Sequence, residues 1–162
     1  MATERNDVAD QLGAFLLERQ LTLTTAESCT AGWVGEMLAA VSNSSQFYSC
    51  GFITYTYAAK HRVLGVSEQT LTKHTAVSEA AVSEMASGAK KCSGDAISIA
   101  VSGYAGPDGG EDGTPAGTVW FAWGLPDDSI RTCHKWFDGE SQEVMRKATH
   151  YAVSELYKIL TS

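Results

Sequence analysis

The run Glu27-Ser28-Cys29-Thr30 brings a carboxylate, two hydroxyls and a thiol together in four consecutive positions. The preceding residues, 21–25, are β-prone, and apolar residues between Trp33 and Val41 recur at helical spacing. A strand that runs straight into a helix places such a run at the helix N-terminus, where unpaired N–H groups stabilise negative charge. The run therefore suits nucleophilic catalysis. Taken alone, the run is more typical of a simple cap, in which Ser28 or Thr30 accepts a main-chain N–H.

Two further candidates, Tyr55 and Lys60, lie where the next predicted strand meets the next predicted helix. Residues 50–57 are aromatic and β-branched and predict a strand, and residues 58–64 predict a helix that ends at Gly65. A serine hydroxyl needs an adjacent base, and a lysine serves as one when burial depresses its pKa. The alternatives are a core aromatic for Tyr55 and a solvated helix charge for Lys60.

A glycine-rich loop covers residues 102–117, in which six of sixteen residues are Gly. It follows a small, apolar predicted strand at residues 95–101, so it lies at the carboxyl end of a strand, where open α/β sheets bind ligands. The loop has no Gly-Lys-Ser/Thr and no helix after it, which excludes a Walker A loop and a dinucleotide fingerprint. A ligand-binding loop is predicted, and an irregular surface loop is the alternative.

The remaining segments predict the elements that position these residues. Residues 8–16 form an amphipathic helix, and Ser78 caps another helix that ends at Gly94. Strands at 118–124 and 130–137 are joined by a short turn and must be antiparallel. The last helix, at 142–160, carries Arg146 in its first turn, where a cation does not suit the helix dipole and an anionic partner is expected.

The composition of the whole chain excludes several classes of protein. Its 162 residues are enough for one domain with its own core. The net charge of −7 without a basic block argues against nucleic-acid binding. The four cysteines and four histidines have no metal-ligand spacing, so no metal is expected. No signal peptide and no 18-residue apolar run is present, which predicts a cytoplasmic protein with free thiols and no membrane contact.

Several motifs occur together and in a fixed order along the chain. They are AESCTAG, GFITY with Lys60 five residues beyond Tyr55, AVSE, SGYAGPDGG and GTVW. This set resembles the CinA C-terminal family, the nicotinamide-nucleotide amidases, over about residues 8 to 160. The resemblance implies a three-layer α/β/α sandwich with a mixed, mostly parallel sheet. It implies a single domain of this type over residues 1–162, in the stand-alone form without the extra N-terminal domain of larger members.

The resemblance also implies a function. The chain is expected to hydrolyse the amide of nicotinamide mononucleotide, a step of pyridine nucleotide salvage that gives nicotinate mononucleotide and ammonia. No cofactor and no metal is expected. The expected partner is a small nucleotide, with neither nucleic acid nor membrane, and self-association into a homo-oligomer is left open.

Site residues follow from the positions that match the family motifs. The catalytic serine, tyrosine and lysine fall on Ser28, Tyr55 and Lys60. Lys60 is expected to deprotonate Ser28, and Tyr55 to relay the proton or to hold the lysine. Cys29 is the rival nucleophile, because helix N-termini favour thiolates. Substrate-binding positions are expected at Thr30, Ser44, Ser45, Gly103, Ala105, Gly106 and Arg146.

This sequence departs from the family pattern at three places. Ala31 replaces the first glycine of the usual ESCTGG, a lysine is absent before Gly117, and an arginine is absent from Gly139-Glu140-Ser141. Two missing cations weaken the case for a phosphate site. The alternative is a relative that acts on another small amide, or one without amidase activity that binds a small ligand or serves in assembly.

Overall fold

The computed structural model describes the chain from Ala2 to Ser162, with side chains from Asp7 onward. The helices of this part are α1 (Ala2–Arg19), α2 (Trp33–Ala39), α3 (Tyr57–Leu64), α4 (Glu68–His74), α5 (Glu79–Ser93) and α6 (Ser141–Thr161), with a 3-10 turn, η1, at Ser44–Gln46. The strands are β1 (Leu23–Glu27), β2 (Tyr48–Ile53), β3 (Ile97–Gly103), β4 (Thr118–Gly124) and β5 (Ile130–Trp136).

The five strands form one mixed sheet in the order β2-β1-β3-β4-β5. β1 pairs in parallel with both β2 and β3, while β4 is antiparallel to both β3 and β5. The central strands β1 and β3 are buried along their length, whereas the edge strand β2 alternates between half-buried and exposed residues. The predicted antiparallel pair at the end of the chain is confirmed by the β4–β5 ladder.

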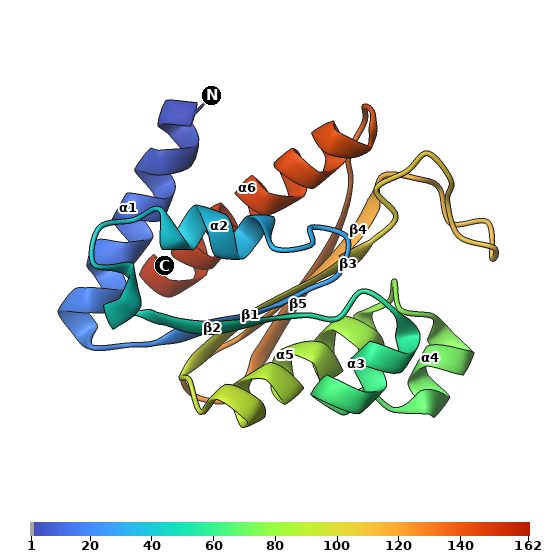
Figure 1. Cartoon of the computed structure of the whole chain (residues 1–162), viewed down its shortest axis with the longest axis horizontal. Helices are drawn as coiled ribbons and strands as arrows, with labels where there is room; N and C mark the ends of the chain where they lie inside the picture. Colours follow the sequence, from blue (N-terminus) through green and yellow to red (C-terminus); the bar gives the residue numbers. More distant parts are fainter. Residues whose placement is uncertain (1) are drawn as a thin grey trace.

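Helices cover both faces of the sheet, which gives three layers (Figure 1). α1, α2 and α6 lie over one face, and α3, α4 and α5 lie over the other. Each face has its own cluster of buried apolar side chains. Leu12, Leu38, Phe121 and Trp123 belong to the cluster under α1, α2 and α6, and Val82 and Met85 belong to the cluster under α5. The predicted three-layer α/β/α fold with a mixed sheet is confirmed.

Two predicted elements differ from the structure. The helix after residue 30 begins only at Trp33 and ends at Ala39, because the residues before it form a turn with left-handed backbone at Ala31 (φ 47°) and Gly32 (φ 104°). Helix α4 was not predicted from its short sequence EQTLTKH, in which only Leu71 is buried.

The part of the chain that the structure describes contains no helix long and apolar enough to cross a membrane. Within the same residues, no group of three or more His, Cys, Asp and Glu side chains is arranged to hold a metal ion. All four cysteines are free thiols.

Candidate active site

Ser28 and Lys60 meet at the carboxyl end of the sheet. The distance between Lys60 Nζ and Ser28 Oγ is 2.9 Å, although the two residues are 32 positions apart in sequence. Both side chains are buried, with 1% of Lys60 and 7% of Ser28 exposed. The predicted convergence of these two residues is confirmed.

Separate elements bring the two side chains together. Ser28 directly follows β1, and its N–H donates to Val101 O on β3 at 3.0 Å. Lys60 lies one turn into α3, a helix that begins after Thr56, whose hydroxyl accepts the N–H of Ala59. Because β2 runs parallel to β1, the chain leaves β2 at the same edge of the sheet at which it leaves β1. The strand order thus dictates that the start of α3 faces Ser28.

The ammonium group of Lys60 has three oxygen partners and no carboxylate among them. Besides Ser28 Oγ, Nζ contacts the main-chain oxygens of Thr54 at 2.8 Å and Tyr55 at 3.3 Å. Burial lowers the pKa of Lys60 from 10.5 to about 8, and the neighbouring Cys29 opposes this shift. The carbonyl oxygens only accept, so a neutral Lys60 donates its two N–H groups to them and turns its lone pair to the Ser28 hydroxyl.

The turn that carries Ser28 is held by the side chain of Glu27. This carboxylate is 2% exposed and accepts the Thr30 hydroxyl at 2.5 Å, the N–H groups of Gly32 and Val34 at 3.1 and 3.0 Å, and the N–H of Gly35 at 3.0 Å. The prediction that Ser28 or Thr30 caps this helix is therefore wrong. The N-cap position is Gly32, and the carboxylate five residues earlier takes the N–H groups that a cap would take.

This arrangement also corrects the expected source of oxyanion stabilisation. The first N–H groups of α2 are occupied by Glu27 and are not available to a substrate. Among the residues that the structure describes, the N–H groups of Cys29 and Thr30 have no oxygen partner. They are the two N–H groups that immediately follow Ser28 in the chain.

The thiol of Cys29 is poorly suited to act as a nucleophile. Burial and, to a lesser extent, the charge of Glu27 raise the pKa of Cys29 to about 12, against smaller opposite effects of Lys60 and of the N–H groups of Cys29 and Gly103. A thiol with such a pKa is almost entirely protonated at neutral pH. The helix N-terminus, which was expected to favour a thiolate, is satisfied by Glu27.

The glycine loop begins beside this centre, as predicted. Gly103 ends β3, and a Cβ there would come within 2.7 Å of Thr118 O and 2.9 Å of Val119 Cα, so only glycine fits. Beyond it, a hollow of about 440 Å³ opens between the loop and the start of α6. It is lined by Ala105, Gly106, Pro107, Ala116, Gly139, Glu140 and Ser141.

The other predicted site residues lie in different surroundings. The Tyr55 side chain is 66% exposed, and its contact with Lys60 is made by the main-chain oxygen rather than by the phenol. The Thr30 hydroxyl is fully buried and donates to Glu27, so it is not presented to a ligand. Arg146 forms an ion pair with Glu143 at 2.8 Å, one helical turn apart on α6.

Ser44 and Ser45 are not brought to this centre by the fold of one chain. They lie in η1, directly before β2, whose first residue is aligned with the first residue of β1. Ser28 follows the last residue of β1, at the opposite edge of the sheet. The Ser44 hydroxyl donates to Ala39 O and closes the turn after α2.

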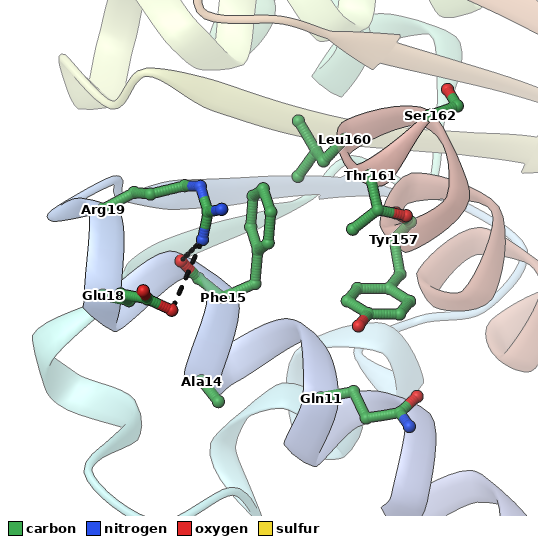
Figure 2. A pocket seen from close by; sticks show the side chains of 9 residues that line it. All are labelled: Gln11, Ala14, Phe15, Glu18, Arg19, Tyr157, Leu160, Thr161 and Ser162. Atoms are coloured by element: carbon green, nitrogen blue, oxygen red, sulfur yellow. Dashed lines mark hydrogen bonds and ion pairs between the residues drawn. The ribbon is translucent and has the colours of Figure 1, made fainter.

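A second hollow, of about 530 Å³, lies between α1 and the end of α6 (Figure 2). Its side chains include Phe15, Arg19 and Tyr157, and the Arg19 guanidinium lies 3.7 Å from the centre of the Phe15 ring. Arg19 also pairs with Glu18 at 3.6 Å. This hollow lies near the start of β1, at the edge of the sheet away from Ser28. Among the described residues, no nucleophile with an adjacent base lines it.

Comparison with known proteins agrees with the motif pattern. The family model described as CinA C-terminal domain matches residues 5–160. The chain belongs to the CinA C-terminal domain family. Protein YdeJ of Escherichia coli is 44% identical over 154 residues, which cover 95% of this chain and 89% of that protein. The nicotinamide-nucleotide amidohydrolase PncC of Escherichia coli is 42% identical over 156 residues, which cover 96% and 94%.

Solved structures of the CinA family share this fold. The crystal structure of the competence damage-inducible protein A from Klebsiella pneumoniae is 45% identical and superimposes with a TM-score of 0.95 over 97% of both chains.

Within the CinA fold seen here, Glu27 is the residue of the centre that sequence reasoning missed. N-cap rules look for polar residues next to the first helical residue, and Glu27 lies at the end of the preceding strand.

Proposed function

We propose that this chain hydrolyses the carboxamide of a nicotinamide nucleotide, with Ser28 as the nucleophile and Lys60 as the general base. The observation that carries the proposal is the 2.9 Å contact between Lys60 Nζ and Ser28 Oγ, with a pKa of about 8 for the lysine. Relatives named nicotinamide-nucleotide amidohydrolase, at about 42% identity over nearly the whole chain, support the type of substrate.

The reaction starts when neutral Lys60 takes the proton of the Ser28 hydroxyl. Ser28 Oγ forms a bond to the carboxamide carbon, and the resulting tetrahedral intermediate collapses as Lys60 returns the proton to the departing nitrogen. Ammonia leaves and an ester remains on Ser28. Water, deprotonated by the same lysine, then hydrolyses the ester, which gives nicotinate mononucleotide and restores Ser28. The single lysine thus serves both halves of the reaction, as in other Ser–Lys hydrolases.

Charge on the amide oxygen needs N–H donors that are already in place. We assign this role to the N–H groups of Cys29 and Thr30, because they follow the nucleophile and have no oxygen partner. The N–H of the residue after the nucleophile has the same role in hydrolases whose serine lies on a strand-to-helix turn.

The rest of the substrate would extend along the carboxyl edge of the sheet. Gly103, Ala105 and Gly106 offer main chain without bulky side chains, and the hollow at Ala105 and Gly106 reaches the start of α6. Arg146 is the proposed partner of the phosphate, which it would bind in place of Glu143. The exposed phenol of Tyr55 is proposed to contact the substrate, while its carbonyl holds Lys60.

One observation favours a second candidate, a small amide without a phosphate. Among the described residues, the hollow at the start of α6 is lined by Glu140 and by no cation, and Arg146 is already paired with Glu143. A phosphate would meet fewer positive charges here than the family pattern provides. Hydrolysis of a neutral or cationic amide by the same Ser28–Lys60 pair is compatible with this charge distribution.

Ammonia release from three ligands tests the proposal. Nicotinamide mononucleotide, its nucleoside and free nicotinamide are each incubated with the purified chain. Preference for the mononucleotide supports the nucleotide assignment, and preference for the nucleoside supports the second candidate. No ammonia from any of the three would reject hydrolysis of a nicotinamide ligand by this chain.

A further inference from the structure

Glu27 is a buried carboxylate without a cation in ion-pair contact among the described residues. All of its side-chain partners lie in one short segment, the Thr30 hydroxyl and three N–H groups of residues 32–35. Four donors at 2.5 to 3.1 Å satisfy both oxygens of an ionised carboxylate. The Glu27 side chain therefore links the end of β1 to the first turn of α2, and Ser28 belongs to the turn between them.

The enclosed turn has no regular secondary structure to hold it. Ala31 and Gly32 have left-handed backbone angles, of which the one at Ala31 is unfavourable for a residue with a side chain. The main chain of Ser28 is fixed on both sides, since its N–H donates to Val101 O and its carbonyl accepts the N–H of Ala31, each at 3.0 Å. The Glu27 side chain maintains this conformation, and with it the direction of Ser28 Oγ.

Glu27 is also connected to the other half of the pair. Its main-chain oxygen accepts the N–H of Thr54 at 2.9 Å, and the oxygen of Thr54 accepts from Lys60 Nζ at 2.8 Å. One residue thus fixes the nucleophile through its side chain and the base through its main chain. Its charge is not among the influences on the pKa of Lys60, which burial lowers and Cys29 raises.

We infer that Glu27 is a positioning residue for the reaction, which holds Ser28 Oγ in hydrogen-bond distance of Lys60 without touching the substrate. The inference rests on the proposed function of the Ser28–Lys60 pair. A misplacement of about 1 Å between reacting groups costs on the order of 100-fold in rate. Loss of the Glu27 carboxylate should therefore reduce kcat while substrate binding is retained.

The test uses Glu27→Gln, which keeps the shape of the side chain but turns an NH2 group toward donors. The matched control is Glu84→Gln. The Glu84 carboxylate also accepts one main-chain N–H, from Ser67 at 2.8 Å, and one threonine hydroxyl, from Thr70 at 2.5 Å, but it contacts neither Ser28 nor Lys60. Both variants lose hydrogen bonds of the same kinds, four at Glu27 and two at Glu84, so the Tm of each variant reports its loss of stability separately from its kcat.

Four quantities are measured on both variants and the wild type: Tm, kcat, KM, and the rate at which a small sulfonyl fluoride labels Ser28, read by peptide mass spectrometry. The expected result for Glu27→Gln is a kcat lower by about 10- to 100-fold, an unchanged KM, slower labelling, and a kcat–pH midpoint that stays near the wild-type value. Glu84→Gln is expected to lower Tm without changing kcat or labelling.

The inference is overturned if folded Glu27→Gln labels Ser28 and turns over at wild-type rates, or if Glu84→Gln loses as much kcat. A failure of the proposed function gives different experimental results. In that case Ser28→Ala retains the activity of the wild type, or the wild type releases no ammonia from the three ligands. If the substrate is another amide, slower labelling of Ser28 in Glu27→Gln would still support the positioning role. If wild-type Ser28 is not labelled, both the role of Ser28 as the nucleophile and the positioning role of Glu27 are rejected.

Discussion

The protonation of Lys60 should set the pH dependence of catalysis. Only the neutral amine can take the Ser28 proton, and burial lowers the pKa of this lysine from 10.5 to about 8. We expect kcat/KM to rise with pH through a midpoint near 8 and to level off above it. The assay is initial-rate ammonia release between pH 6 and 10, with the folded fraction checked at each pH.

The size of the effect follows from the two pKa values. At pH 7 a lysine with a pKa of 8 is about 9% neutral, whereas a lysine with the ordinary pKa of 10.5 is about 0.03% neutral. Burial of Lys60 thus increases the reactive fraction by about 300-fold at neutral pH. A rate that rises with a midpoint near 10.5, or one that is flat from pH 6 to 10, would refute the role of Lys60 as the base.

The same shift predicts a pH dependence of stability. Between pH 8 and 10.5 the unfolded chain binds a proton at Lys60 that the folded chain does not, so the free energy of unfolding should rise with pH across this window. The lowering of the Lys60 pKa from 10.5 to about 8 corresponds to a change of about 3 kcal/mol in the free energy of unfolding. Chemical denaturation of Lys60→Met, which lacks the titrating group, should show a gain with pH that is smaller by this amount. Equal pH dependence in the two proteins would mean that Lys60 keeps an ordinary pKa in the fold.

Three further predictions concern neighbouring residues. Cys29→Ala should keep most of the amidase activity, because burial keeps the Cys29 thiol protonated; loss of activity, together with inactivation of the wild type by iodoacetamide, would move the chemistry to the thiol. Arg146→Ala should weaken binding of nicotinamide mononucleotide by about 10- to 150-fold in calorimetry and leave the nucleoside unaffected, because a bidentate charged contact is lost; equal effects on both ligands would exclude a phosphate contact. Ala31→Gly should raise the free energy of unfolding by about 0.5 to 1 kcal/mol, because Ala31 has a φ of 47° and an exposed side chain; a lower Tm would show that the left-handed conformation is not strained.

Much of the fold could be predicted because its signals are local. The apolar periodicity of α6 and the short turn between β4 and β5 depend on residues close together in sequence. The order of the strands depends on distant pairings, which no local pattern encodes. Helix α4 escaped prediction for a related reason, since only one of its seven side chains is buried and it has little apolar periodicity.

The candidate site was predicted in part. Ser28 and Lys60 were paired through the family motifs and through their predicted places at a strand end and a helix start, and their side chains lie 2.9 Å apart. The role of Glu27 could not be predicted, because it depends on the three-dimensional path of residues 28–32. This path brings the first N–H groups of α2 next to the Glu27 carboxylate at the end of β1. The exposure of the Tyr55 phenol and the pairing of Arg146 with Glu143 also depend on tertiary surroundings.

The most direct test of the account is ammonia release from nicotinamide mononucleotide by the wild type, Ser28→Ala and Lys60→Met in one assay. The wild type should form ammonia and nicotinate mononucleotide in equal amounts. Each variant should be slower by a factor on the order of 1,000 or more, because nucleophile and base act as a unit. Both variants should remain folded by circular dichroism. A folded Ser28→Ala variant that releases ammonia within tenfold of the wild-type rate would contradict the central claim.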